Sequence, residues 1–235
     1  MIISVHQPAY LPWLGYFHKI MLSDQFIFLD TVQFEKNSFN NRNKIKTPKE
    51  ALWLSVPVLT KNYKEKKFHE IEIAQEDWNK KHFKTIVLNY KNSTYFDHYI
   101  DQMEQILIKN HYQFLADLNF DLLVFFLDVL NIKTTILKSS QHDFKGTKSE
   151  LILNICKELG ATGHIFGALG KNYVDENIFK SHGLKVFYQN YQHPVYKQLY
   201  GDFIPNLSII DLLFNEGPRS KEIIMCNNQS KGSLI

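Results

Sequence analysis

The sequence is poor in cysteine. Only Cys156 and Cys226 occur among 235 residues, and neither has a metal-ligand partner at a suitable spacing. A zinc site built on thiolates is therefore not expected, and we predict no metal centre. Two distant cysteines also give no disulfide framework, which is typical of a protein in a reducing compartment. The cysteine content therefore favours a cytoplasmic protein.

Long hydrophobic runs are also missing. The N-terminus lacks the basic segment of a signal peptide, and Pro8 and Pro12 interrupt its apolar stretch. The most apolar later stretch, residues 120–130, is too short for a membrane span and contains Asp121 and Asp128. We therefore expect neither a signal peptide nor a membrane span.

A large net charge is absent as well. The formal net charge is only +3, which does not favour a nucleic acid as partner. Much of the excess is local, in the cluster Lys36, Arg42, Lys44, Lys46 and Lys49. Such a cluster suits a phosphorylated small molecule or a nucleotide-linked sugar. We therefore predict a small-molecule substrate; no feature of the sequence indicates an oligomeric state.

Glycine is scarce, at 10 residues, whereas tyrosine and phenylalanine are plentiful, at 12 and 18. Ligand-type side chains are most concentrated in the turn His6-Gln7-Pro8-Ala9-Tyr10-Leu11-Pro12-Trp13-Leu14-Gly15-Tyr16, which follows a short apolar run. The prolines fix φ and push the preceding residues to extended geometry, so the turn should be stiff. A stiff polar turn after a strand costs little to pre-organise around a ligand. This turn is therefore the first candidate for a binding site.

The first 30 residues have the pattern of a parallel βαβ unit. Residues 2–5 and 26–29 form short apolar runs typical of buried strands, and residues 14–22 have helical spacing. Ligands gather at the carboxyl ends of such strands. His6 and Gln7 follow the first strand, and Asp30 and Gln33 follow the second. We therefore expect these four side chains at the same edge of the sheet.

The rest of the chain extends this unit into an α/β domain. Residues 134–137, 164–167 and 184–191 predict further strands, so we expect a mainly parallel central sheet flanked by helices. Three helical patterns predict a helical insert at residues 77–130. We predict a single α/β domain over residues 1–220. Residues 221–235, which are polar and weakly patterned, are expected to form a frayed tail.

Three shorter segments complete these expectations. Residues 32–46 are polar but contain aromatic side chains that need burial, which predicts an ordered loop. Residues 51–58 predict a strand that ends near Pro57, and residues 70–73 alternate as a half-exposed strand would.

Each candidate side chain also has a structural interpretation, and both remain open. His6 is either a general acid or base or a histidine bonded to a backbone carbonyl. Asp30 either caps a turn, orients His6, or binds a hydroxyl or amine of a ligand. Tyr10 and Trp13 either stack on a ring of the substrate or belong to the core. A metal on His6 and His18 is not expected, since no third ligand has a convincing spacing.

Two further segments suit an anion. Asn41-Arg42-Asn43, with Lys36 and Lys46, offers a guanidinium between amides, although a charge run is more often a solvated loop. Gly167-Ala168-Leu169-Gly170 follows a predicted strand, and its backbone N–H groups could hold an anion. It has neither the Walker A nor the GxGxxG spacing, and no GxSxG motif is present.

Several longer motifs run through the chain: His6-Gln7-Pro8-x-Tyr10-Leu11-Pro12-Trp13-x-Gly15-Tyr16, Asp30-x-Val32-Gln33-Phe34-x-Lys36, Asn41-Arg42-Asn43-x-Ile45-Lys46 and Phe203-Ile204-Pro205-x-Leu207-Ser208-Ile209-x-Asp211. In these residues the sequence closely resembles the WbqC-like family, and the resemblance covers nearly the whole chain. It implies a role in bacterial surface-polysaccharide (O-antigen) biosynthesis. For some members of the family it implies attachment of an amino acid such as glycine to the amino group of a nucleotide-linked aminosugar.

A weaker likeness, at the level of the fold, connects the opening strand–turn–helix with the adenylate-forming nucleotidyltransferase group that includes pantothenate synthetase. The HxGH signature of that group is absent, and Gly15-Tyr16-Phe17-His18 is the nearest stretch. This likeness implies an ATP site and is an analogy of fold only.

We therefore predict a transferase that moves an acyl or aminoacyl group onto the amine of a nucleotide-linked aminosugar. His6 would accept a proton from the amine, and Asp30 or Gln33 would orient it. The predicted substrate-binding residues are Gln7, Tyr10, Trp13, Lys36, Asn41, Arg42, Asn43, Lys46, Gly167 and Gly170. The donor stays open between an acyl thioester and ATP with an amino acid. Two alternatives also stay open: an ATP-dependent adenylate-forming amide ligase, and a non-catalytic module that binds a sugar nucleotide or a protein partner.

Overall fold

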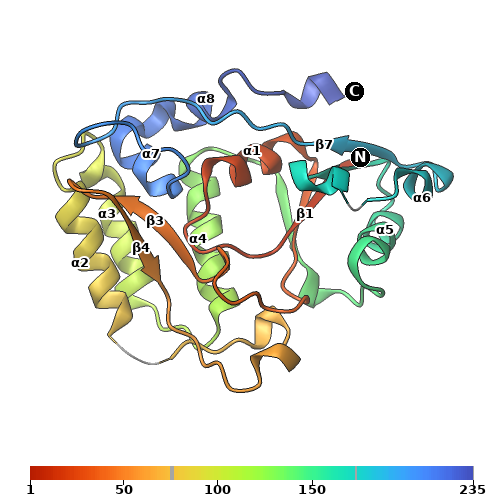
Figure 1. The fold of residues 1–235 in the computed structure, drawn as a ribbon, viewed down its shortest axis with the longest axis horizontal. Helices are drawn as coiled ribbons and strands as arrows, with labels where there is room; N and C mark the ends of the chain where they lie inside the picture. The colour runs from red at the N-terminus through yellow and green to blue at the C-terminus, as the bar shows by residue number, and fades with distance from the viewer. Residues whose placement is uncertain (75–76, 173, 235) are drawn as a thin grey trace.

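A five-stranded parallel sheet forms the centre of the computed structural model, which describes residues 1–74, 77–172 and 174–234 (Figure 1). The strands are β1 (Ile2–His6), β2 (Gln25–Phe28), β5 (Thr135–Lys138), β6 (Gly163–Phe166) and β7 (Lys185–Tyr188). Their order in the sheet is β5-β2-β1-β6-β7, and every neighbouring pair is parallel. The predicted α/β fold with a parallel central sheet is therefore confirmed.

Helices cover both faces of this sheet because the strand residues alternate between two apolar clusters. Phe26 and Phe28 of β2 pack with α1 (Leu14–Leu22) and α4 (Leu115–Val129). Ile27, one residue out of phase, packs on the other face with α5 (Lys148–Glu158) and α6 (Glu176–Ser181). Strands buried on both faces read as continuous apolar runs, which is the pattern of the first two strands.

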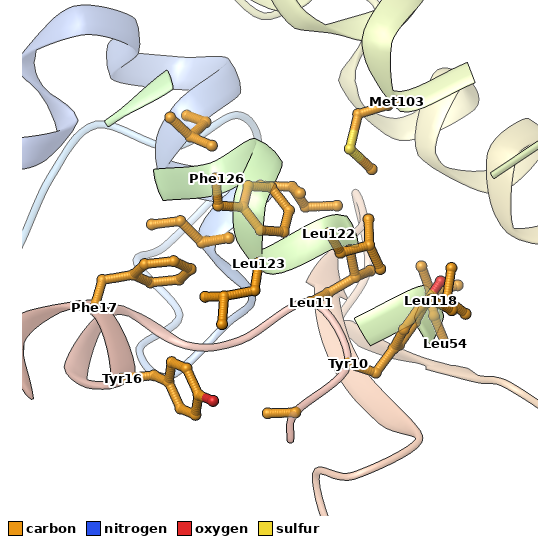
Figure 2. Packing of buried hydrophobic residues seen from close by; sticks show 14 of the residues in the cluster. Tyr10, Leu11, Tyr16, Phe17, Leu54, Met103, Leu118, Leu122, Leu123 and Phe126 are labelled. Atoms are coloured by element: carbon orange, nitrogen blue, oxygen red, sulfur yellow. The ribbon is translucent and has the colours of Figure 1, made fainter. Parts of the chain in front are cut away.

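The predicted helical segment around residues 77–130 is also confirmed. It contains α2 (Trp78–Tyr90), α3 (Phe96–Glu104) with a one-turn π-helix at Gln105–Lys109, and α4. Leu123 and Phe126 of α4 lie beside Phe17 of α1, Leu122 lies beside Leu11, and Leu118 of the same helix lies beside Leu54 (Figure 2). The segment and the sheet therefore share one apolar core.

Residues 32–46 differ from the prediction, whereas the strand predicted at residues 51–58 is present over residues 51–55. Residues Arg42–Lys46, expected in a loop, form β3, which pairs with β4 (Ala51–Ser55) as an antiparallel hairpin outside the main sheet. The alternation of buried and partly exposed side chains explains the difference. Arg42 and Lys44 are partly exposed, whereas Asn43 and Ile45, which follow them in turn, are buried. Residues 70–73 form only isolated bridges, Val58 to Ile73 and Glu72 to Phe114, and not a strand.

The C-terminal part also differs from the predicted frayed tail. It follows α7 (Ile209–Glu216) and contains α8 (Ser220–Met225) and a last short turn at Lys231–Leu234. Ile224 is fully buried in the main core, and Lys231 pairs with Asp24. A few anchoring residues in a polar segment are thus enough to fix it to the domain. In the residues that the structure describes, no helix has the length and apolar character needed to cross a bilayer.

Candidate functional site

The strand order creates a crevice between β1 and β6. From β1 the chain continues to β2 on one side, and from β6 it continues to β7 on the other, so the connections diverge at this point. In open parallel sheets, ligands bind outside the carboxyl ends of the strands at such a divergence. A hollow of about 590 Å³ lies there, bordered by His6 at the end of β1, by Gly167 and Gly170 after β6, and by Gln189 after β7.

A second hollow of about 620 Å³ adjoins the first, since Gln7, Leu29, Glu35 and Ile152 border both. It extends to the start of α5, where it is bordered by residues 146–149. Two smaller hollows, of about 440 and 280 Å³, lie beside Asp24 at the opposite edge of the sheet. We call the two joined hollows at the carboxyl edge the cleft. Each is of the size that small-molecule sites in proteins have.

His6 borders the cleft, and among the described residues one of its ring nitrogens, Nε2, has no hydrogen-bond partner. Its Nδ1 donates a hydrogen bond to the carbonyl oxygen of Gln7 at 2.9 Å, so the neutral ring carries its proton on Nδ1 and leaves Nε2 as an acceptor. Burial is the larger cause, and the charge of Lys19 the smaller, of a pKa of His6 that is lowered to about 4. The rings of Trp13 and Tyr16 meet it edge-on at 5.5 and 4.9 Å between centroids. At pH 7 His6 is therefore a neutral, oriented acceptor.

The stiff turn predicted after β1 is held by asparagine side chains. Asn40 donates to the carbonyl oxygen of Pro8 at 2.7 Å and to Oε1 of Gln7 at 3.3 Å. Asn43, which is fully buried, donates to the carbonyl oxygen of Leu11 at 2.6 Å. Leu11 has a φ of 44°, a strained value for a residue with a branched side chain. Asn43, predicted to bind substrate, thus lies beneath the turn and fixes its backbone.

The aromatic residues of the turn divide between core and cleft. Tyr10 is fully buried and its hydroxyl bonds to Nδ1 of His82 at 2.9 Å, so its ring belongs to the core. Trp13 is partly buried, borders the cleft beside His6, and meets Phe39 at 5.2 Å between ring centroids. Phe39 in turn lies 5.9 Å from Trp53 of β4. Three aromatic rings therefore form a row that leads away from His6, which we call the aromatic row.

Asp30 and Gln33 do not contact His6. Asp30 is buried and its carboxylate accepts bonds from the hydroxyl of Ser139 at 2.8 Å and from the hydroxyl and backbone N–H of Ser140 at 2.6 and 2.8 Å. It thereby ties the end of β2 to the end of β5, which is the turn-capping interpretation. Gln33 is exposed and borders only the second hollow. Gln7 borders both hollows, and its Nε2 lies 3.4 Å from Oε1 of Glu35.

The predicted anion cluster is dispersed in the structure. The guanidinium of Arg42 lies 4.5 Å above the ring of Trp53, with Lys44 above the same ring at 5.1 Å. Lys36 is exposed and approaches the ring of Tyr63 instead. Asn41 donates to the carbonyl oxygen of Val56.

Lys46 is buried elsewhere. Its Nζ bonds to Oε1 of Gln198 at 2.9 Å and to the carbonyl oxygen of Asp202 at 2.5 Å. The same Gln198 also donates to the buried carboxylate of Asp211. Lys46 therefore belongs to an internal polar network of the fold. Arg42 and Lys44 remain as cations beside the aromatic row, and neither has a carboxylate partner in the part of the chain that the structure describes.

The loop after β6 forms one wall of the cleft. Gly167 and Gly170 both border it, and Leu169 between them is 74% exposed. A Cβ on Gly170 would lie 2.7 Å from the Cβ of Phe166, so only glycine allows the loop to pack this closely onto β6. At Gly167 a Cβ would meet nothing within 4 Å.

The sequence gives no signal for two residues that border the cleft. Lys19 is 4% exposed on α1, and its Nζ donates to the carbonyl oxygen of Val5 at 2.9 Å. Gln189, directly after β7, donates through Nε2 to the carbonyl oxygen of Gly15 at 2.7 Å and to Nδ1 of His18 at 2.9 Å. His18 bonds through Nε2 to the carbonyl oxygen of Gln229, so it supports Gln189 from behind the cleft. Gln189 lies inside the strand predicted at residues 184–191, whereas β7 ends at Tyr188, so the predicted strand gave no indication that Gln189 stands at a strand end.

The described residues contain no group of side chains that could hold a metal ion. Across residues 1–74, 77–172 and 174–234, no three histidine, cysteine, aspartate or glutamate side chains are grouped as metal ligands are.

Comparisons with known proteins gave one family and one relative of similar length. The model of the WbqC-like protein family matches residues 7–223, a range that begins one residue after His6 and includes the rest of the turn, the aromatic row and the loop after β6. An uncharacterized protein of Mycobacterium tuberculosis (strain ATCC 25618 / H37Rv), Rv1507c, is 34% identical over 223 residues, which is 94% of this chain and 96% of the relative. No solved structure gives a significant match.

Proposed function

Because the chain belongs to the WbqC-like protein family, we propose that it transfers an acyl or aminoacyl group to the amine of a nucleotide-linked aminosugar. The reaction would belong to the biosynthesis of a bacterial surface polysaccharide, in the cytoplasm. One observation carries the proposal: at the point where β1 and β6 diverge, a cleft is lined by a neutral histidine with a free acceptor nitrogen, an aromatic ring and a buried lysine.

Amide formation suits a neutral histidine in this position. Only the neutral amine is nucleophilic, and its N–H can donate to Nε2 of His6 while the nitrogen attacks the carbonyl carbon. When the C–N bond forms and the bond to the leaving group breaks, the amine proton becomes acidic. A group with a pKa of about 4 accepts the proton only at that stage and stays unprotonated before it. His6 therefore orients the amine first and accepts its proton second.

The developing negative charge on the carbonyl oxygen needs donors in the same hollow. The side-chain amides of Asn41 and Asn43 are engaged elsewhere, since Asn41 donates to the carbonyl oxygen of Val56 and Asn43 to that of Leu11. The loop after β6 is the remaining source, because its backbone at residues 167–169 borders the hollow and backbone N–H groups stabilise such oxyanions.

The aromatic row gives the nucleotide-linked part of the substrate a place to bind. Trp13 lies beside His6, whereas Trp53 and Phe39 are 40% and 39% exposed at the outer end. Sugar rings and bases pack on such faces. Arg42 and Lys44 lie above Trp53, and their charges favour a diphosphate. We therefore place the amine at His6 and the phosphates toward Arg42.

An ATP-dependent amide ligase is a second candidate, and the second hollow favours it. This hollow continues past Gln7 to the first turn of α5, whose N-cap residue Thr147 makes no side-chain capping bond. Helix N-terminal N–H groups favour phosphate, and the crevice of a doubly wound sheet suits a nucleotide. ATP would activate an amino acid here, and the amine at His6 would then attack it.

The direct test is product formation. Purified protein would be incubated with a UDP-linked aminosugar and either an acyl thioester or glycine with ATP, and the sugar nucleotide would be analysed by mass spectrometry. We expect an amide product. His6→Gln should lower kcat by about 100-fold or more, and Arg42→Gln should raise KM about tenfold.

The exposed Arg219, which pairs only with Glu216, provides the control, and Arg219→Gln should leave both constants unchanged. Tight binding of the sugar nucleotide without product from any donor would contradict the transferase and support a non-catalytic binding module.

A further inference from the structure

Lys19 is a buried amine that is incompletely bonded. It is 4% exposed, and the only acceptor for its Nζ within the residues described is the carbonyl oxygen of Val5, at 2.9 Å. An ammonium group has three N–H donors, so two remain without a partner. The side chain borders the hollow between β1 and β6, together with His6, Tyr16 and Gln189.

No carboxylate among the described residues forms an ion pair with this amine. The groups that face it are His6 from β1 and His164 from β6, and the charge of Lys19 lowers the pKa of both imidazoles, with burial as the larger cause. Glu35 borders the same hollow from the loop after β2, but its side chain is exposed and it forms no ion pair with Lys19. A buried cation without a counter-ion is unfavourable, and an anionic ligand in the hollow would relieve this.

We infer that Lys19 forms an oxyanion subsite, in which its two free N–H groups donate to an anionic phosphoryl or carboxyl oxygen of a ligand bound between β1 and β6. The inference deepens the proposed function and rests on it for the identity of the ligand. A phosphoryl oxygen would come from a nucleotide, and a carboxyl oxygen from an amino-acid donor. In both cases the anion lies next to His6, where the amide bond would form.

The geometry separates this role from a purely structural one. A lysine that only anchors β1 would direct its amine at several backbone oxygens, whereas the amine of Lys19 bonds to one among the described residues and its side chain borders the hollow. Burial lowers the pKa of Lys19 to about 7, so the amine is partly neutral before a ligand arrives. An anion favours the charged form, so binding must raise this pKa.

The experiment measures the ionisation of Lys19 directly. The protein would be labelled with 13C at the Cε of lysine, the Lys19 resonance assigned by its loss in Lys19→Arg, and the pH titration followed by NMR. Titrations would be run without ligand, with millimolar pyrophosphate, and with millimolar glycine. A rise of one pKa unit means tenfold tighter binding of the anion to the charged form.

We expect the pKa of Lys19 to rise by about one unit or more in one of the two arms. A rise with pyrophosphate alone identifies a phosphoryl subsite, and a rise with glycine alone a carboxyl subsite. The exposed Lys157 at the far end of α5 is the internal control and should not shift in either arm. An unchanged Lys19 resonance in both arms overturns the inference.

A binding measurement provides the second readout. In calorimetry, Lys19→Met should lower the affinity for the anion that shifts the Lys19 resonance by about tenfold or more. Lys157→Met should leave this affinity unchanged. Neither measurement needs turnover, so the anion subsite at Lys19 and the proposed transferase function can be contradicted independently of each other. A shifted Lys19 without amide product contradicts the proposed function alone, and amide product with an unshifted Lys19 contradicts the subsite alone.

Discussion

Replacing Lys19 by methionine is expected to make the protein more stable at neutral and mildly acidic pH. Methionine keeps the length and burial of the side chain but removes the amine. Lys19 is 4% exposed, and among the described residues its amine bonds only to the carbonyl oxygen of Val5. Folding therefore removes the amine from water, which costs free energy. Burial lowers its pKa from 10.5 to about 7.

The magnitude follows from this pKa shift. Between about pH 7 and pH 10 the unfolded chain keeps the proton that the folded chain has released, so the stability of the natural protein rises with pH in this window. The slope approaches about 1.4 kcal/mol per pH unit, and because the folded amine is still half protonated at pH 7, the rise between pH 7 and pH 9 is about 2 kcal/mol. At pH 6 the full penalty is present, roughly 5 kcal/mol. The variant loses one hydrogen bond, about 1 kcal/mol. Lys19→Met should therefore be more stable by roughly 2–4 kcal/mol at pH 6.

Urea unfolding of both proteins at pH 6, 7, 8 and 9 measures this difference, and groups common to both proteins largely cancel. The advantage of the variant should shrink steadily above pH 7. Lys157→Met, which removes an exposed lysine, should differ from the natural protein by the same amount at every pH. A free-energy difference between the natural protein and Lys19→Met that does not change from pH 6 to pH 9 would refute a desolvated amine at this position.

Three further changes test how the site is supported. Gly170→Ala places a Cβ 2.7 Å from that of Phe166 and should lower the unfolding free energy by about 1–3 kcal/mol, whereas Gly167→Ala, with nothing within 4 Å, should change it little in the same urea titration. Asn43→Ala leaves the strained Leu11 backbone without its donor; a loss of about 2–3 kcal/mol is expected in thermal unfolding, and an unchanged Tm would show that the turn holds without it. Asp30→Asn removes acceptor capacity from three bonds between the ends of β2 and β5 and should cost about 1–3 kcal/mol, with faster amide exchange at Ser140 as the local readout.

Local pattern was sufficient to predict the central sheet. Strands β1 and β2 lie in short apolar runs because both of their faces are covered, and the connecting helix α1 fits between them. Strand β4 of the hairpin was predicted, but β3 was missed because its alternation is carried by asparagine and lysine side chains instead of apolar ones. Asn43 is buried to bond a distant carbonyl group, and no local pattern indicates such a partner.

The candidate site was predictable only in part. His6 and Trp13 follow from their place after β1, and the structure brings both to the cleft. Lys46 and Tyr10 have the residue types of a binding site, but long-range partners, Gln198 and His82, bury them elsewhere. Lys19 gave no signal, because a lysine in the last turn of a short helix is normally exposed. It is buried because its side chain lies against β1, where its amine bonds to the carbonyl oxygen of Val5.

A crystal structure of the protein with a UDP-linked aminosugar tests the central claim most directly. The claim predicts the ligand in the cleft, with its amine within hydrogen-bond distance of Nε2 of His6 and its phosphates toward Arg42. Density for the sugar nucleotide at the opposite edge of the sheet, in the hollows beside Asp24 and Lys231, would contradict it.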